Sequence, residues 1–141
     1  MTDVLAYMKD AGHERRYYSP NYETLLEATG LKVLECEYFG SYQGDALAIV
    51  SDGERKGMSV WGYGSCSGCD ALEAQPPLNE NGDWSGVNAL ADEMRQGVRW
   101  PEEGETVHDV ARRMASKERT HDWYVYDNEM RTWLENFAER I

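Results

Sequence analysis

Two cysteines lie close together in the middle of the chain, within a glycine-rich segment that follows an apolar run. Cys66 and Cys69 form a C-x-x-C pair. Two thiols at this spacing can chelate one tetrahedral metal ion, or alternate between a dithiol and a disulfide, because a tight turn brings both sulfur atoms to one side. Residues 61–72 are therefore the strongest candidate for chemistry in this sequence.

A structural zinc site needs two more ligands than this pair supplies. The remaining candidates are Cys36 and the three histidines, His13, His108 and His121, and none belongs to a second paired motif. Cys36 falls on a predicted strand that could lie across the sheet from the start of the cysteine segment. Zinc held by Cys66, Cys69 and Cys36, with one histidine as the fourth ligand, therefore stays an open interpretation.

Thiol redox chemistry is favoured where a cysteine opens a helix, because the helix dipole lowers the thiol pKa. Asp70 directly follows Cys69, and its negative charge would raise that pKa instead. A thioredoxin-like C-x-x-C also follows a parallel βαβ unit, which this sequence does not predict. The plainer interpretation is structural: the glycines allow a sharp turn, Ser65, Ser67 and Asp70 satisfy backbone groups, and the thiols pack as small apolar side chains.

A second candidate site is the aromatic run at residues 121–126, which contains His121 and Trp123. Aromatic clusters with a titratable neighbour are typical of the mouth of a small-ligand pocket. His121 and Asp122 would point to opposite faces of a strand, so we do not expect them to share a proton in catalysis. These residues are therefore candidates for binding and not for catalysis.

Tyrosines near the N-terminus form a third candidate surface. Tyr17 and Tyr18 follow Arg15 and Arg16, and tyrosine and arginine are enriched at protein–protein hot spots. Tyr22 lies close by, in the first turn of a predicted helix, where it could instead belong to the core. The candidate binding residues are therefore Tyr17, Tyr18, Tyr63, Ser65, Ser67, Asp70, His121 and Trp123.

The charge of the protein restricts its partners. The chain has 141 residues and a net charge of −12, and 41% of its residues are hydrophobic. This length indicates one globular domain over residues 1–141, with enough material for a core that needs neither disulfides nor metal. A negative field of this size repels nucleic-acid phosphates and anionic lipids and attracts basic protein surfaces. Direct binding to nucleic acid is therefore not expected.

The sequence also predicts where the protein acts. No apolar run approaches the ~20 residues of a membrane span, and a basic region followed by a signal core is missing at the N-terminus. The three cysteines are an odd number, which argues against a secreted disulfide framework and for reduced thiols. We therefore expect a cytoplasmic protein without a membrane partner.

Three strands are expected in succession, over residues 31–39, 46–51 and 57–63. The middle run is apolar at successive positions, which indicates a central strand covered on both faces. Asp52 and Gly53 form the dipeptide that favours a tight hairpin between the second and third strands. The pattern therefore predicts an antiparallel meander.

Helices are expected on both sides of the strands. A first helix capped by Thr2 should end near Gly12, and a second should begin with Ser19 as its N-cap and end at Gly30. Three C-terminal helices are expected over residues 85–97, from Thr106 with Asp109 completing a capping box, and from Asp127 onward. The sequence therefore predicts an α+β fold: a small antiparallel β-meander of three or more strands packed with N-terminal and C-terminal helices.

Residues 42–47, and the segment from Gly62 through Glu73 with its GSCSGCDAL sequence, resemble a group of small uncharacterised proteins encoded by bacteriophages and bacterial prophages. Those proteins carry a similar strand, hairpin and thiol segment, and the H-D-W sequence at residues 121–123 is similar to an element of the same group. The resemblance covers about a third of the chain. It implies a phage accessory protein acting in the host cytoplasm, and it assigns no catalytic or binding residue.

Three functions are consistent with these observations. The first is a non-enzymatic, acidic accessory protein that binds a host or phage protein with a basic surface. The alternative is a metal-binding or thiol-redox module built on Cys66 and Cys69, with Cys36 or His121 as a further ligand and zinc as the expected metal. The third is an enzyme acting on a nucleotide or another small molecule, which requires a deep pocket that joins the glycine-rich turn to His121.

Overall fold

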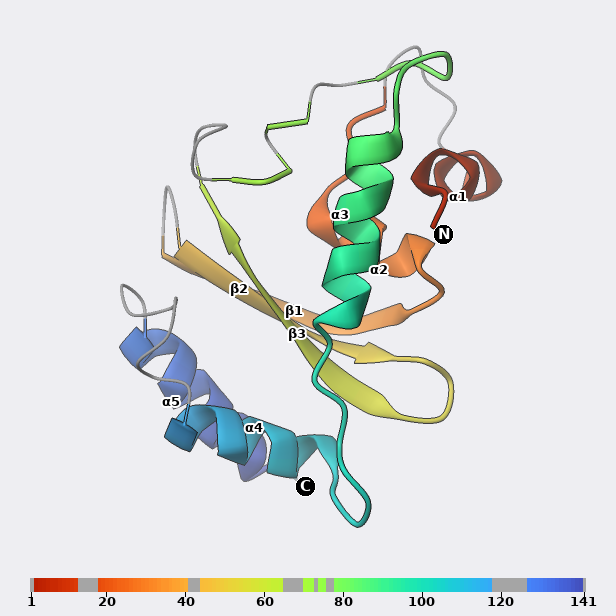
Figure 1. Ribbon diagram of the computed structural model, residues 1–141. Coiled ribbons are helices and arrows are strands. Elements are labelled where there is room, and N and C mark those ends of the chain that lie inside the picture. The colour runs from red at the N-terminus through yellow and green to blue at the C-terminus, as the bar shows by residue number, and fades with distance from the viewer. Residues whose placement is uncertain are drawn as a thin grey trace.

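The computed structural model describes residues 2–12, 18–40, 44–64, 70–72, 74–75, 78–117 and 127–140. These residues form one three-stranded antiparallel sheet, in the order β1-β2-β3, and five helices (Figure 1). The elements are α1 (Val4–Asp10), α2 (Tyr22–Ala28), β1 (Lys32–Gly40), β2 (Gly44–Ser51), β3 (Lys56–Tyr63), α3 (Ser85–Gln96), α4 (Val107–Lys117) and α5 (Asp127–Ala138). The predicted α+β fold, a meander packed with N-terminal and C-terminal helices, is confirmed.

The central strand β2 is buried on both faces, as its apolar sequence predicts. Ala46, Ala48 and Val50 face a core shared with α1, α2 and α3, whereas Leu47 and Ile49 face a core shared with α4 and α5. Figure 1 shows these two groups of helices on opposite sides of the sheet. A single strand therefore contributes to both cores, and the sheet separates them.

The hairpin between β2 and β3 turns at the predicted dipeptide. Gly53 adopts a φ of +99°, a left-handed conformation that glycine reaches without strain. The Asp52 carboxylate accepts hydrogen bonds from the backbone amides of Arg55 (2.7 Å) and Glu54 (2.9 Å) and pairs with the Arg55 guanidinium. These bonds lower the pKa of Asp52 to about 2, and the bond from the Arg55 amide has the largest effect.

Two of the predicted helix caps are wrong by one or two residues. Asp3, not Thr2, caps α1 by accepting a hydrogen bond from the amide of Ala6 (3.0 Å). Asn21, not Ser19, caps α2 by accepting from the amide of Thr24 (2.8 Å). In each case the side chain that directly precedes the first helical residue is the one that reaches the unpaired backbone amides of the first turn. The hydroxyls of Thr2 and Ser19 lie further from the helix and do not cap it.

Other helix ends match their sequence signals. Gly30 follows α2 with a φ of +95°, which confirms the predicted left-handed stop. The capping box of α4 is present, since Asp109 accepts from the amide of Thr106 (2.9 Å) and Thr106 accepts from the amide of Asp109 (3.4 Å). Within the described ranges, the helices are all too short or too polar to traverse a lipid bilayer.

Gly57 tests how tightly the segment after α3 packs on β3. A Cβ atom at Gly57 would lie 2.7 Å from Cε3 of Trp100 and 2.9 Å from the carbonyl oxygen of Arg99. We expect Gly57→Ala to lower the free energy of unfolding by about 1–3 kcal/mol, because backbone and ring must both move. Urea denaturation measures this.

Gly97 provides the matched control for that substitution. It has a φ of −80° and a Cβ there would meet nothing closer than 3.6 Å, so Gly97→Ala should be neutral or stabilising by up to about 1 kcal/mol. Equal stabilities for the two variants would contradict the packing at Gly57.

Candidate functional site

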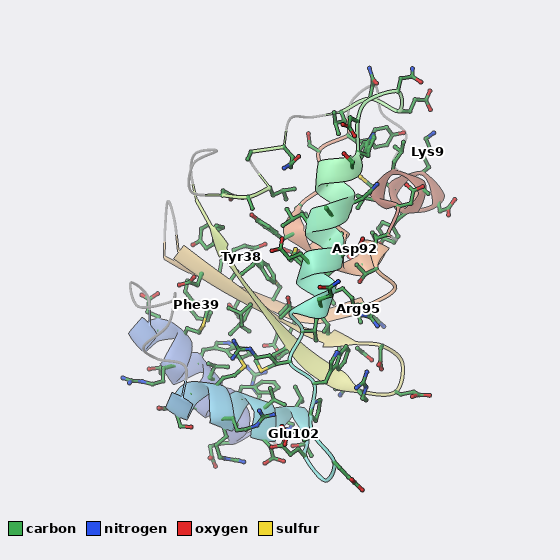
Figure 2. The ribbon with its side chains drawn as sticks, viewed as in Figure 1. Lys9, Tyr38, Phe39, Asp92, Arg95 and Glu102 are labelled. Atoms are coloured by element: carbon green, nitrogen blue, oxygen red, sulfur yellow. The ribbon has the colours of Figure 1, made fainter. Side chains whose placement is uncertain are left out.

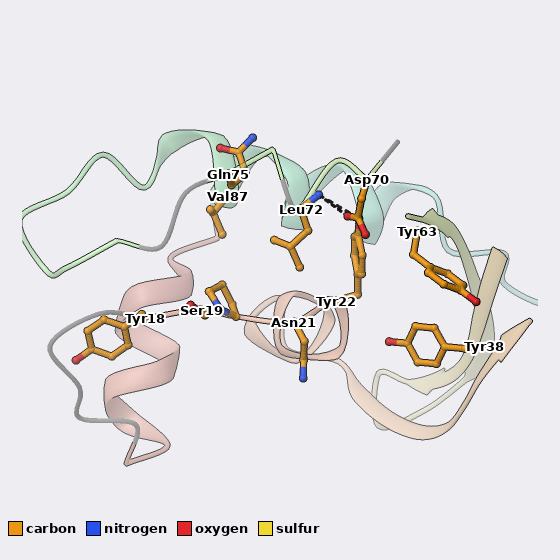
Figure 3. Close-up of a pocket in the computed structure, with 11 residues that line it drawn as sticks. Tyr18, Ser19, Asn21, Tyr22, Tyr38, Tyr63, Asp70, Leu72, Gln75 and Val87 are labelled. Carbon is orange, nitrogen blue, oxygen red and sulfur yellow. Dashed lines mark hydrogen bonds between the residues drawn. The ribbon is translucent and has the colours of Figure 1, made fainter. Parts of the chain in front are cut away.

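A cavity of about 440 Å³ lies between the start of α2, the ends of β1 and β3, and the turn that includes residues 70–72 (Figure 3). Four tyrosines contribute to its walls, and Asp70 is the one charged residue among the described residues that line it. The lining consists of Tyr18, Tyr22, Tyr38, Tyr63 and Asp70, the apolar residues Pro20, Leu72 and Val87, and the polar residues Ser19, Asn21 and Gln75. Of the eleven described residues that line the site, four are therefore tyrosines and one carries a carboxylate.

Small residues on β2 allow large rings to meet above the sheet. Tyr38 of β1 and Trp61 of β3 both pair with Ala46, and Tyr63 pairs with Gly44. The ring centroids of Tyr38 and Tyr63 are 5.3 Å apart at 76°, and those of Tyr38 and Trp61 are 6.0 Å apart at 80°. These edge-to-face contacts hold the rings at one end of the cavity.

Tyr38 and Phe39 show how strand alternation selects which ring reaches the cavity. They are adjacent on β1 but lie on opposite faces of the sheet, with Tyr38 on the side of α2 and Phe39 on the side of α5 (Figure 2). Tyr38 keeps 46% of its surface exposed, whereas Phe39 keeps 8%. Tyr38 therefore stands at the rim of the cavity, and Phe39 belongs to the opposite core.

Tyr18 closes the other end of the cavity. It forms an isolated β-bridge with Leu78, through hydrogen bonds of 2.7 and 3.3 Å, and its ring packs edge-on against Trp84 at 5.9 Å. Its side chain is 4% exposed. The bridge ties the segment before α2 to the segment before α3, so both walls at this end are fixed.

The carboxylate of Asp70 connects three parts of the chain. It accepts hydrogen bonds from the hydroxyl of Tyr22 on α2, from the amide of Gly64 after β3 (3.0 Å) and from the amide of Leu72 (3.0 Å), the last drawn in Figure 3. The Tyr22 hydroxyl also accepts from the Leu72 amide (3.0 Å). The negative charge is therefore held in a fixed position in the wall.

The hydroxyls of Tyr38 and Tyr63 donate to protein acceptors. Tyr63 donates to the carbonyl of Phe39 (2.8 Å), and Tyr38 donates to the carboxylate of Glu23 (2.6 Å). Burial, followed by the bond to Glu23, raises the pKa of Tyr38 above its usual value. Both phenol rings are therefore oriented by these bonds, which suits them to be rigid walls.

Cys36 lies next to the carboxylate of Glu23, which also accepts the hydrogen bond from Tyr38. Its Sγ is 3.6 Å from Oε1 of Glu23, and burial, with the nearby Glu23 charge, raises the pKa of the thiol to about 12. A neutral thiol is a poor nucleophile. Cys36 packs against the core of α1, α2 and α3, whereas His108 stacks on Phe137 at 4.8 Å on the opposite side of the sheet.

The zinc and redox alternatives depend on residues whose placement lies outside the described ranges, Cys66, Cys69 and His121. Among the residues that are described, no group of three or more His, Cys, Asp or Glu side chains is arranged to hold a metal ion. Cys36 and His108, the two candidate ligands that are described, lie on opposite faces of the sheet. These two residues therefore do not share a site.

The raised pKa of Cys36 predicts slow alkylation. In a Cys66→Ser/Cys69→Ser variant, which leaves Cys36 as the sole thiol, iodoacetamide should react at pH 8 at least about a hundredfold more slowly with the folded than with the urea-unfolded protein. The rate should keep rising with pH well beyond 9, because the thiolate forms only near the raised pKa. A rate that levels off near pH 9 would contradict this environment.

Three of the predicted binding residues meet at the cavity: Tyr18, Tyr63 and Asp70 all line it. Five others fall outside the described residues and are not placed: Tyr17, Ser65, Ser67, His121 and Trp123. The sequence did not single out Tyr38, and it left Tyr22 as a core candidate, although both line the cavity. Tyr22 serves both roles, since it is 6% exposed and its hydroxyl reaches Asp70.

Comparison of the chain with protein-family models, with curated proteins and with solved structures gives no significant match. The resemblance to phage and prophage proteins therefore stays a prediction. The chemistry of the cavity is the basis on which a function can be proposed.

Proposed function

We propose that this protein is a non-enzymatic binding module whose tyrosine-walled cavity receives a positively charged side chain of a partner protein. The observation that carries the proposal is the combination of four tyrosines with Asp70 as the single charged lining residue among those described. Aromatic rings attract cations through their quadrupole, and a carboxylate attracts them by charge. Both effects strengthen where water is excluded from the site.

The long-range electrostatics support the same class of partner. A net charge of −12 steers a basic surface toward the protein and repels an acidic one. At the rim, the carboxylate of Glu23 adds a further negative charge beside the Tyr38 hydroxyl. A lysine or arginine side chain on a basic partner would therefore meet negative charge both on approach and inside the cavity.

The state of the hydroxyls supports binding over catalysis. Tyr22, Tyr38 and Tyr63 each donate to a protein acceptor, and the raised pKa of Tyr38 keeps it protonated at neutral pH. A general acid or base needs a pKa near the working pH and a proton free to move. We therefore assign the tyrosines to recognition. If the resemblance to phage proteins holds, the partner is a host or phage protein in the host cytoplasm.

A pair of variants on β1 tests the proposal. Tyr38 and Leu34 lie on the same strand and are 46% and 42% exposed, but only Tyr38 lines the cavity. The immobilised wild-type protein should retain a basic partner from host lysate and release it as salt is raised. Tyr38→Ala should weaken retention about tenfold, since one cation–π contact is worth roughly 1–2 kcal/mol, and Leu34→Ala should not.

Tyr38→Phe separates the ring from its hydroxyl. It keeps the aromatic wall and removes the bond to Glu23, so it should retain the partner nearly as well as the wild type. Retention that is unchanged in Tyr38→Ala, or a set of retained proteins that is not basic, would refute the proposed site.

A further inference from the structure

We infer that the cavity selects a methylated lysine side chain on the partner over unmodified lysine and over arginine. The inference rests on the proposed function, because it specifies which cation the same cavity takes. Three features carry it: a fixed carboxylate that already accepts three hydrogen bonds from the protein, an aromatic end formed by rings set at a steep angle, and apolar side chains along the cavity.

The first feature concerns hydrogen-bond acceptors. Three protein donors already point at the Asp70 carboxylate: the Tyr22 hydroxyl and the amides of Gly64 and Leu72. Oδ1 of Asn21 is also engaged, by the amide (2.8 Å) and the hydroxyl (2.7 Å) of Thr24. The Asp70 carboxylate and the Asn21 carbonyl oxygen are therefore engaged by the fold, and Gln75 and Ser19 are the other polar side chains among the described lining residues.

The engagement of Asp70, the one charged acceptor among the described lining residues, separates one cation from another. An unmodified ammonium and a guanidinium both carry several N–H donors that lose water on entering, and a buried donor without an acceptor costs about 1–3 kcal/mol. A trimethylated ammonium has no N–H to satisfy and is weakly hydrated, yet it keeps its positive charge. The Asp70 charge therefore attracts all three groups, whereas desolvation opposes the unmodified ones more strongly.

The second feature is the aromatic end of the cavity. Tyr38 and Tyr63 meet at 76° with 5.3 Å between ring centroids, and Asp70 and Tyr22 lie next to them (Figure 3). Methyl groups on a cation contact aromatic rings favourably while the charge remains close to them, which is how aromatic cages recognise quaternary ammonium groups. Asp70 accepts from the amide directly after Tyr63, so the charge and the rings are built into one corner.

The third feature is the apolar lining away from this corner. Leu72 and Val87 appear in Figure 3 between Tyr18 at one end and the Tyr38–Tyr63 pair at the other. The aliphatic stem of a lysine side chain can lie along such a surface while its head reaches the charged corner. Tyr38, which is 46% exposed, leaves the corner accessible from solvent. The apolar surface beside this corner favours a cation that carries an aliphatic stem, and the net charge of −12 favours a basic protein as its carrier.

Three peptides of one neutral sequence test the inference, each with a single lysine that is unmodified, trimethylated or replaced by arginine. Titration calorimetry on the whole protein should give a dissociation constant for the trimethyl-lysine peptide at least about tenfold lower than for the other two. The Tyr38→Ala variant should lose this preference, and Leu34→Ala should keep it. Choline, a free quaternary ammonium, should compete more weakly than the trimethyl-lysine peptide.

Each contrary outcome has a definite meaning. If unmodified lysine or arginine binds as tightly as trimethyl-lysine, the inference is wrong and the proposed function stands. If no peptide binds but capture of a partner still depends on Tyr38, the inference is again wrong and the proposed function stands. If neither peptide binding nor capture depends on Tyr38, both fail. If choline binds more tightly than the trimethyl-lysine peptide, the protein-borne lysine is refuted in favour of a free ligand.

Discussion

Replacing Asp70 with alanine should lower the free energy of unfolding by about 2–4 kcal/mol and abolish cation binding at the cavity. The Tyr22 hydroxyl and the Gly64 and Leu72 amides would all lose their acceptor in a partly buried setting. Hydrogen bonds to a charged group contribute about 1.5–3 kcal/mol each, and some of this loss is recovered as water enters. Urea denaturation measures the stability, and the peptide titration measures the binding.

Two variants control for the Asp70 result. Glu103→Ala removes an exposed carboxylate from the loop between α3 and α4, so it changes the net charge equally and should alter stability by less than about 0.5 kcal/mol. Tyr22→Phe removes one of the three donors and keeps the ring, so it should cost about 1 kcal/mol and preserve binding. If Asp70→Ala proves as stable as Glu103→Ala, Asp70 does not hold this wall together.

Replacing Leu47 with alanine should lower the free energy of unfolding by about 3 kcal/mol and leave the cavity intact. Leu47 is fully buried in the core beneath α4 and α5, so the substitution leaves a hole that the surrounding side chains only partly fill. Because its neighbours Ala46 and Ala48 belong to the other core, unfolding should remain a single transition. Denaturation followed by circular dichroism and by tryptophan fluorescence tests both statements.

The matched control for this prediction is Leu34→Ala, at a leucine that is 42% exposed, which should cost well under 1 kcal/mol. Peptide affinity measured under conditions where Leu47→Ala is folded should equal that of the wild type, because Leu47 faces away from the cavity. Two separate unfolding transitions, or a loss of affinity in the folded variant, would contradict the view of β2 as the strand that joins two cores.

Features fixed by short-range chemistry were predictable from the sequence. The apolar run of β2, the left-handed glycines at positions 30 and 53 and the capping box of α4 all lie where the sequence places them. The caps of α1 and α2 were wrong because two residues one or two positions apart offered acceptors, and the choice depends on which residue directly precedes the first turn.

The cavity was only partly predictable, because the alternation of side chains along β1 decides which of them face the cavity and which face the other side of the sheet. The register of β1 shifts between Val33 and Glu35, so Val33 and Cys36 face the same core despite their odd spacing. Simple alternation from Val33 would place Tyr38 on the other face. This bulge brings Tyr38 to the cavity, and nothing in the sequence around it marks the shift.

The most direct test of the proposed function is a nuclear magnetic resonance titration of the uniformly ¹⁵N-labelled protein with a basic peptide that carries one trimethyl-lysine. The amides of Gly64 and Leu72 both donate to Asp70, so they report on any cation that reaches this carboxylate. We predict saturable shifts at these two amides, with little change in α4 and α5. Shifts confined to α4 and α5, or none at Gly64 and Leu72, would contradict the cavity as the binding site.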